Sequence, residues 1–412
     1  MDNMVYIERE LEKEIQKWID EREILVIRGP RQCGKTTLLN RIKKRLIETG
    51  VEDLNIVYID FDDDLVRMSF ENNCKEFINS YIVNNKKTYF LFDEVQNIKD
   101  VGKKLKIIFD LVNNQKIIAT GSSSFDLTSL GKYLVGRVIF FNLLPFNFLE
   151  FLRAKNERYE KIYKEIKINL HNTNLKESVL INELNGLLHE YLTFGGYPRV
   201  VLESDKEKKK EILKNLFITY IEKDVIPMYG NKYRDKIVVL LKSLSEMLGN
   251  VIKYETLTEN TGLKYNELKE IIPLLQDSFI ISVVTPFYKN LITELRKNPK
   301  IYFVDFGIRN YLLSNFNNLD FAHLYENFVY NQLKTIHNIK YWRTTSKTEV
   351  DFVAVDSIII PIEVKSTPKV TRALRSFIST YSAETAFIPN LSIAKKVDID
   401  KCSIFMAPFV YF

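Results

Sequence analysis

Apolar and polar positions alternate in blocks along the first 150 residues. Short apolar runs are separated by longer stretches of mixed polarity. The apolar runs lie near residues 24–28, 55–60, 88–92, 116–120 and 137–142. Strands that alternate with helices are typical of a parallel sheet with helices on both faces. We therefore expect an α/β fold with a parallel sheet over residues 1–150.

The pattern becomes helical after residue 150, with Lys and Glu paired at i, i+4. We expect this segment, residues 151–235, to form a helical lid. Three helices and then two strands are predicted at residues 236–248, 254–261, 265–277, 280–285 and 300–304. A helix-turn-helix followed by a hairpin indicates a winged helix, so we assign residues 236–312 to a winged-helix-like domain.

Residues 313–412 form a last predicted domain, in which an amphipathic helix carrying Glu326 precedes several strands. Side chains two positions apart on a strand share a face. Asp351 therefore lies on the same face as Glu349, and Glu363 on the same face as Lys365. We expect Asp351, Glu363 and Lys365 to converge at the strand ends, with Glu326 approaching from the helix.

The composition of this 412-residue chain places only weak limits on its partners and its location in the cell. Its net charge of +6 permits a nucleic-acid partner without requiring one. The three cysteines are widely spaced, so no disulfide framework is predicted, and a reducing, cytoplasmic location fits best. The N-terminus does not read as a signal peptide, and no apolar run of about eighteen residues predicts a membrane span.

The segment VIRGPRQCGKTTLL matches the phosphate-binding pattern G-x-x-x-x-G-K-[ST] and lies between a predicted strand and a predicted helix. The two glycines of this pattern let successive N–H groups point at phosphate oxygens, next to the positive end of the helix. Lys35 is expected to reach the β- and γ-phosphates, and Thr36 to hold Mg²⁺. The predicted nucleotide-binding residues are Gly29, Pro30, Arg31, Gln32, Cys33, Gly34, Lys35, Thr36 and Thr37.

A second acidic motif follows the apolar run of KTYFLFDEVQNI. An Asp-Glu pair after a buried strand is the Walker B arrangement. We expect Asp93 to support Mg²⁺ and Glu94 to orient or activate the attacking water. Together the two motifs predict ATP and Mg²⁺ as ligands.

Three more residues are candidates for contact with the γ-phosphate. Thr120 and Ser122 end the fourth predicted strand, at the position of a sensor in AAA-type ATPases. Arg137 precedes the fifth strand and could stabilise developing phosphate charge, in cis or from a neighbouring subunit. Equally, Arg137 could have a structural role and bond to the edge of a strand.

The winged-helix-like segment permits contact with duplex DNA. Lys264, Tyr265 and Asn266 open the predicted recognition helix, and the loop between the two strands carries Lys289, Arg296, Lys297 and Lys300. The acidic residues of the helix would repel phosphates, which favours protein packing over base reading. Phosphate contact by the loop stays open.

The chain resembles a group of archaeal and bacterial AAA-superfamily ATPases through the series GPRQCGKTT, FLFDEVQ, ATGSSS, LVGR, LLPFNFLEFL and GGYPRVV. Proteins of that group carry a winged-helix segment and an uncharacterised C-terminal domain similar to PD-(D/E)xK nucleases. The resemblance implies an AAA-like P-loop core, followed by an α/β restriction-endonuclease-like domain at the C-terminus.

The order helix-Glu, strand-Asp, strand-ExK is similar to the PD-(D/E)xK site, with Val350 in place of the usual proline. The resemblance implies that Glu326, Asp351 and Glu363 hold a second Mg²⁺ or Mn²⁺. It also implies that Lys365 positions or deprotonates a water. A nuclease fold that has lost its activity is the alternative.

Three functions follow as hypotheses. The first is an ATPase that drives or gates the C-terminal domain, and the second is an ATP-regulated, metal-dependent DNA or RNA endonuclease. The third is a non-catalytic ATP-dependent switch that recruits a protein partner. A homo-oligomer is compatible with each of them.

Overall fold

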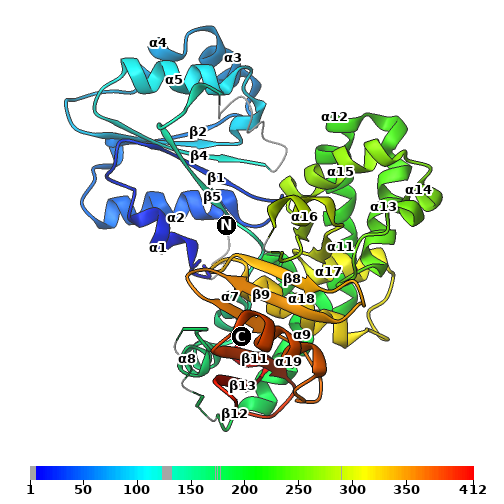
Figure 1. Ribbon diagram of the computed structural model, residues 1–412. Coiled ribbons are helices and arrows are strands. Elements are labelled where there is room, and N and C mark those ends of the chain that lie inside the picture. Colours follow the sequence, from blue (N-terminus) through cyan, green and yellow to red (C-terminus); the bar gives the residue numbers. More distant parts are fainter. Residues whose placement is uncertain (1–5, 123–131, 172, 174, 177, 289) are drawn as a thin grey trace. The chain divides into compact units, whose positions relative to one another are not determined.

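The computed structural model describes residues 6–122, 132–171, 173, 175–176, 178–288 and 290–412 (Figure 1). The chain divides into two compact units. The first runs to Pro145 and includes Asp277–Phe279, and the second holds Phe146–Gln276 and Ile280–Phe412. The finer division of the second unit into lid, winged-helix-like and C-terminal domains stays a prediction.

A five-stranded sheet forms the centre of the first unit, in the order β2-β3-β4-β1-β5. Every neighbouring pair is parallel, so all five strands end at the same edge. The strands are β1 (Ile24–Arg28), β2 (Ile56–Asp60), β3 (Thr88–Asp93), β4 (Gln115–Gly121) and β5 (Val138–Asn142). The predicted parallel-sheet α/β fold is therefore confirmed.

Helices cover both faces of this sheet (Figure 1). They are α1 (Leu11–Gln16), α2 (Lys35–Glu48), α3 (Asp64–Asn72), α4 (Cys74–Asn79) and α5 (Val101–Leu111). Alternate residues of the strands point to opposite faces. Thus Phe90 and Phe92 pack with α3, α4 and α5, whereas Leu91 packs with α1 and α2. Two apolar layers hold the sheet rigid beneath its functional edge.

Helices fill the first part of the second unit, as the sequence predicts. They are α7 (Phe148–Lys155), α8 (Glu157–Ile166), α9 (Ile181–Phe194), α10 (Pro198–Leu202), α11 (Lys206–Tyr220) and α12 (Ile226–Tyr229). Asn147 and Glu150 form a reciprocal capping box at the start of α7. The ring of Phe148 packs edge-on against Phe328, so this helical segment shares a core with the C-terminal part of the chain.

The predicted helix-turn-helix and hairpin are present as α13 (Arg234–Glu246), α14 (Tyr254–Thr261), α15 (Tyr265–Asp277), β6 (Ile281–Val284) and β7 (Lys300–Phe303). Strands β6 and β7 pair antiparallel. The expectation of a plain basic loop between them is wrong, because a helix, α16 (Leu291–Arg296), lies there with Asn290 as its N-cap. The predicted loop residue Lys289 lies outside the described residues. Helix α17 (Phe306–Leu312) follows β7.

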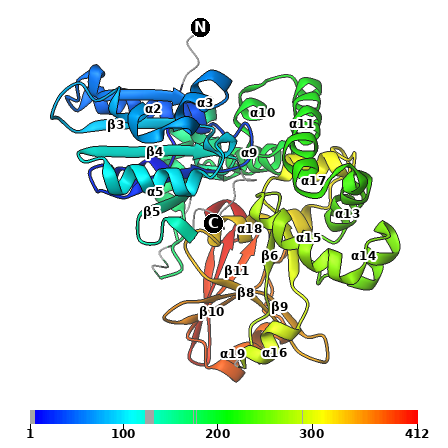
Figure 2. The ribbon, with the colours of Figure 1, turned by 90° about the horizontal axis from the view of Figure 1, so that it is seen from above.

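A six-stranded mixed sheet ends the chain, in the order β12-β13-β11-β10-β9-β8. Its strands are β8 (Ile339–Arg343), β9 (Glu349–Val355), β10 (Ile359–Ile362), β11 (Thr385–Asn390), β12 (Lys395–Ile399) and β13 (Cys402–Pro408). Helix α18 (Phe321–Leu333) precedes the sheet, and helix α19 (Arg372–Tyr381) lies between β10 and β11 in the chain (Figure 2). Phe377 of α19 packs with Trp342 and Val353 of the sheet.

None of the helices in the described ranges combines the length and the apolar character that crossing a membrane requires.

Candidate functional site

The phosphate-binding loop joins the end of β1 to the start of α2. Gln32 and Gly34 both adopt left-handed backbone conformations, with φ of 59° and 99°. Gly29 has no room for a side chain, since a Cβ there would lie 2.0 Å from the backbone oxygen of Leu143. These conformations turn successive N–H groups inward, as an anion-binding loop requires.

Lys35 is buried inside this loop. Its ammonium donates to the backbone oxygens of Gly29 at 3.1 Å and Pro30 at 3.0 Å. Thr36 and Thr37, in the first turn of α2, are exposed. The loop therefore presents a charged amine, a helix N-terminus and free hydroxyl-bearing side chains together, which is the donor set that a nucleotide triphosphate with Mg²⁺ needs.

Asp93, at the end of β3, is held by hydroxyl groups from both neighbouring strands. The Tyr58 hydroxyl of β2 donates to Asp93 Oδ2 at 2.9 Å, and the Thr120 hydroxyl of β4 donates to Asp93 Oδ1. Burial, followed by the nearby charge of Asp93, raises the pKa of Tyr58. Thr120 therefore lies beside the acidic motif, as the sequence predicts for a sensor position.

Glu94 has a left-handed backbone with φ of 56°, which turns the chain away after β3. Its N–H donates to the Thr120 hydroxyl at 3.3 Å, and its carboxylate accepts from the Gln96 amide. The Gln96 carbonyl in turn accepts from the Ser122 N–H at 3.0 Å. Glu94 thus contacts Thr120 directly and Ser122 through Gln96. Sequence reasoning missed Gln96, although it lies two positions after Glu94.

Arg137 lies at the other end of the sheet from the loop. Its backbone oxygen accepts from the N–H of Ile24, the first residue of β1. Its guanidinium is bonded to Asp110 at 3.0 Å and lies over the Phe109 ring. Five strand residues separate that end from the loop, about 16 Å. The cis alternative is therefore wrong, and the strand-edge alternative describes the contacts; a role in trans stays a prediction.

Arg9 supports the phosphate-binding loop from outside the motif. Its guanidinium donates to the backbone oxygens of Cys33 at 2.9 Å and Leu144 at 2.6 Å. It thus joins the loop to the segment after β5. No sequence motif marked this residue. Cys33 is fully buried beside Gly29, and burial raises the pKa of its thiol, which fits a packing role.

A second group of charged residues forms in the C-terminal sheet, as predicted. Lys365 Nζ lies 3.4 Å from Asp351 Oδ2 and 3.4 Å from Glu363 Oε1. Asp351 also accepts from the Val364 N–H at 2.8 Å, and Glu363 from the Thr371 hydroxyl at 2.5 Å. Burial raises the pKa of Glu363. Burial would lower the pKa of Lys365, but the two carboxylates outweigh it and raise that pKa.

Glu326 approaches this group from α18 but is bound by other residues. Lys300 Nζ lies 3.2 Å from its carboxylate, and the Tyr302 hydroxyl donates to it at 2.5 Å. Lys300 also pairs with Glu349 at 2.5 Å. Burial raises the pKa of Glu326. The placement of Lys300 in the basic loop is therefore wrong, because it is a buried residue of β7.

The predicted metal ligands Glu326, Asp351 and Glu363 do not form a closed triad. Within the described ranges, the set of three His, Cys, Asp or Glu ligand atoms within 4.8 Å of one another comes from His171, His337 and Asp356. The Lys300 and Lys365 ammonium groups neutralise the predicted carboxylates instead. The carboxylate oxygens of these residues are suitable ligands for Mg²⁺. The ammonium groups of Lys300 and Lys365 must move away before the ion can bind.

Basic side chains that could contact phosphates are exposed around these segments. Lys347, Lys369, Arg372 and Arg375 are solvent-exposed in the C-terminal domain, and so are Lys264, Tyr265 and Asn266 at the start of α15. Exposure allows contact with nucleic acid, but it is the ordinary state of such residues.

Comparisons with known proteins match three segments of the chain. Residues 21–152 match a family model described as an AAA domain. Residues 185–319 match the domain of unknown function DUF8612, and residues 321–402 match the domain of unknown function DUF4143. The first match covers the sheet with the phosphate-binding loop. The other two describe no activity.

Relatives that match most of this chain are described as uncharacterised proteins. A protein of Methanocaldococcus jannaschii is 28% identical over 355 residues, covering 83% of this chain and 74% of the relative. A protein of Haemophilus influenzae is 26% identical over 366 residues, covering 85% of this chain and 84% of the relative.

Similar solved structures include AMPPCP-bound DnaA from Aquifex aeolicus, 16% identical, covering 66% of this chain and 90% of that one at a TM-score of 0.32. C. elegans PCH-2 is 17% identical, covering 45% of this chain and 54% of that one at a TM-score of 0.31. Scores this low do not establish a shared architecture. The family match and the geometry of the loop agree, however, that this chain carries an AAA-type P-loop domain.

Proposed function

We propose that the chain is a Mg²⁺-dependent ATPase whose chemistry takes place at the edge of the first sheet. One observation carries the proposal. Strand β4 lies between β1 and β3, and its Thr120 bonds both members of the Asp93–Glu94 pair. The loop after β1 and the acidic pair after β3 thus flank one residue, as ATP hydrolysis requires.

Each residue then has a defined task. The loop amides and Lys35 bind and orient the phosphates, and Lys35 exchanges its two carbonyl partners for phosphate oxygens. Thr36 and Asp93 offer hard oxygen ligands for Mg²⁺, which supplies charge neutralisation between the phosphates when bound. Glu94 accepts a hydrogen bond from, or a proton of, the attacking water. Gln96 fixes the Glu94 carboxylate, and Thr120 fixes its backbone.

ATP turnover by the purified chain tests this proposal. Wild type is expected to release phosphate from ATP in Mg²⁺ and not in excess chelator. Lys35→Ala is expected to lose both ATP binding and turnover, whereas Lys44→Ala, an α2 lysine outside the loop, leaves both unchanged. Turnover that survives in Lys35→Ala contradicts the proposal. Tight ATP binding without any turnover by wild type favours the switch that recruits a partner.

A second candidate function is metal-dependent cleavage of nucleic acid by the C-terminal domain. It is supported by the meeting of Asp351 of β9 with Glu363 and Lys365, which directly follow the adjacent strand β10. Lys365 would hold a water or a phosphate oxygen, and the carboxylates would hold Mg²⁺ or Mn²⁺. ATP binding in the first unit would then gate this cleavage.

Incubation of the chain with plasmid DNA and single-stranded RNA, with Mn²⁺ and with or without ATP, tests the second candidate. Cleavage is expected to disappear in Asp351→Asn and in Lys365→Ala. Lys396→Ala, which removes an exposed lysine of the same sheet, is the matched control. Failure of all substrates to be cut, or cleavage that persists in Asp351→Asn, contradicts this candidate and leaves the ATPase proposal untouched.

A further inference from the structure

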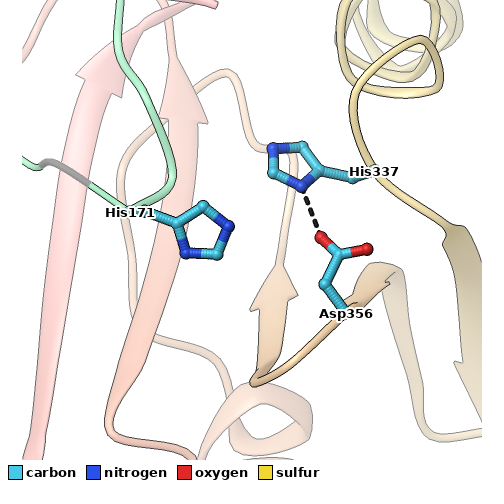
Figure 3. Close-up of side chains that lie close together, drawn as sticks. All are labelled: His171, His337 and Asp356. Carbon is cyan, nitrogen blue, oxygen red and sulfur yellow. Dashed lines mark hydrogen bonds and ion pairs between the residues drawn. The ribbon is translucent and has the colours of Figure 1, made fainter.

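Three metal-ligating side chains from distant parts of the sequence meet at one place in the second unit. His171 follows α8, His337 follows α18, and Asp356 follows β9. One ligand atom of each lies within 4.8 Å of the other two. Figure 3 shows both imidazole rings and the carboxylate directed at a common centre. The two described functions use none of the three residues.

Each side chain is held in place by its surroundings. The Asp356 Oδ2 atom lies 2.5 Å from His337 Nδ1, and its other oxygen accepts from the Asn338 N–H at 3.2 Å. His171 follows the buried Leu170, and its N–H donates to Asn169 Oδ1 at 2.9 Å. The rings of His171 and His337 have centroids 5.5 Å apart. These contacts hold His337 against Asp356, and the His171 ring lies beside them without a metal.

We propose that His171, His337 and Asp356 form a binding site for a divalent metal ion of the Zn²⁺ class. Two imidazoles and one carboxylate suit Zn²⁺, and nitrogen donors do not suit Mg²⁺. Donors of a tetrahedral Zn²⁺ site lie about 3.3 Å apart, given metal–ligand bonds of about 2.0–2.2 Å. The observed spacing needs shifts of about 1–1.5 Å, which exposed side chains make readily.

Binding requires the hydrogen bond between His337 and Asp356 to open. The hydrogen between His337 Nδ1 and Asp356 Oδ2 leaves this contact, either to Nε2 of the same ring or to solvent, before both atoms bind the ion. His171 and Asp356 are exposed, so solvent and the ion have access, whereas His337 is buried and fixes the inner side. Three protein ligands leave a fourth position for water. The ion would tie the loop after α8 to the end of the C-terminal sheet.

This site is separate from the carboxylates of the second candidate function. Asp356 follows Asp351 by five strand positions, or about 16 Å. Whether the metal site exists is therefore independent of whether the C-terminal domain cleaves nucleic acid. It is also independent of ATP hydrolysis.

The four histidines of the chain provide matched controls. His323 Nδ1 lies 2.6 Å from Asp320 Oδ2, which copies the His337–Asp356 pair outside the cluster. His189 packs against the Phe321 ring. Neither histidine belongs to the set of three.

Chelator-treated full-length protein, titrated with Zn²⁺ in excess Mg²⁺ and without nucleotide, tests the proposal. Calorimetry is expected to show one site per chain in wild type, weakened at least about tenfold in His171→Ala and Asp356→Asn. His189→Ala and His323→Ala are expected to bind like wild type. Co²⁺ in place of Zn²⁺ is expected to give a visible absorption band that the two cluster variants lack.

Both cluster variants replace exposed side chains, so they should fold, and circular dichroism checks this. Equal Zn²⁺ affinity in wild type, His171→Ala and Asp356→Asn overturns the proposal. Absence of binding by wild type overturns it as well, and leaves the His337–Asp356 contact as an ordinary hydrogen bond.

Discussion

The ammonium of Lys300 lies 3.2 Å from the carboxylate of Glu326, at the position where a metal ligand was predicted. Lys300 is 2% exposed and also contacts Glu349. Burial would lower the pKa of Lys300, but Glu326, Asp351 and Glu349 outweigh it, so that pKa lies above its usual range. A buried lysine thus occupies the charge-balancing role that a metal has in the nuclease-like arrangement.

Removal of this lysine should destabilise the second unit. Lys300→Met leaves two carboxylates in a buried environment without their cation, and we expect a loss of about 3–5 kcal/mol in unfolding free energy. Urea unfolding followed by Trp342 fluorescence measures it, in a Trp18→Phe background so that the first unit is silent. Lys396→Met, which breaks an exposed pair with Asp398, should cost less than about 1 kcal/mol. Equal losses in the two variants contradict this account.

Asp305 should make the stability of the second unit depend on pH. It accepts from the Gly196 and Ile308 N–H groups, and burial raises its pKa from 3.8 to about 6. The folded state therefore favours the protonated acid. Its stabilising contribution is complete below pH 4 and is lost as the pH rises through 6, by about 3 kcal/mol in total.

The difference in unfolding free energy between wild type and Asp305→Asn isolates this contribution, because other titrating groups cancel. We expect wild type to lose stability relative to the variant between pH 4 and pH 7. A difference that stays constant over this range shows that Asp305 titrates normally in the folded state.

Gly29→Ala should weaken ATP binding without unfolding the chain. The new Cβ would lie 2.0 Å from the Leu143 oxygen, so the loop must move away from the segment that Arg9 holds. We expect ATP affinity to fall more than about tenfold, the equivalent of about 1.4 kcal/mol. Gly186→Ala in α9 is the control, since its Cβ would have no atom within 4 Å. Fluorescent-nucleotide titration measures both, and unchanged affinity in Gly29→Ala argues against a tight loop.

Arg137→Ala should leave turnover of a dilute, monomeric sample within about twofold of wild type, and the lost exposed pair with Asp110 should cost under about 1 kcal/mol. ATP turnover measured across a wide range of protein concentrations tests whether Arg137 acts in trans. A loss that appears only at high concentration indicates that Arg137 acts in trans in an oligomer. A loss at every concentration contradicts its placement at the far end of the sheet.

The sequence predicted features that depend on local pattern. Gly29, Lys35 and Asp93 follow strands whose apolar runs were visible, and parallel strands bring their ends together. Asp351, Glu363 and Lys365 met because the antiparallel strands β9 and β10 are adjacent and the chain continues from β10 through Glu363 to Lys365. These predictions needed only strand alternation and chain order.

Features that depend on distant pairing were not predictable. Lys300 was read as a loop cation, because nothing local shows that β7 lies beside Glu326 and Glu349. Arg9 and Gln96 belong to no recognised sequence motif. His171 and His337 lie far apart in the sequence, and no local pattern shows that the fold brings them together. The contacts of Arg137 could not be read from the sequence, so a role at the γ-phosphate and a structural role at the strand edge stayed equal alternatives.

Substitution of Glu94 by Gln tests the central claim most directly, because it removes a carboxylate and keeps the shape and the Gln96 contact. The measurement is phosphate release from saturating Mg²⁺-ATP, with ATP affinity determined on the same samples. We predict affinity within a few-fold of wild type and turnover lower by about 10²- to 10⁴-fold. Turnover equal to that of wild type would contradict the assignment of Glu94, and with it the proposed ATPase site.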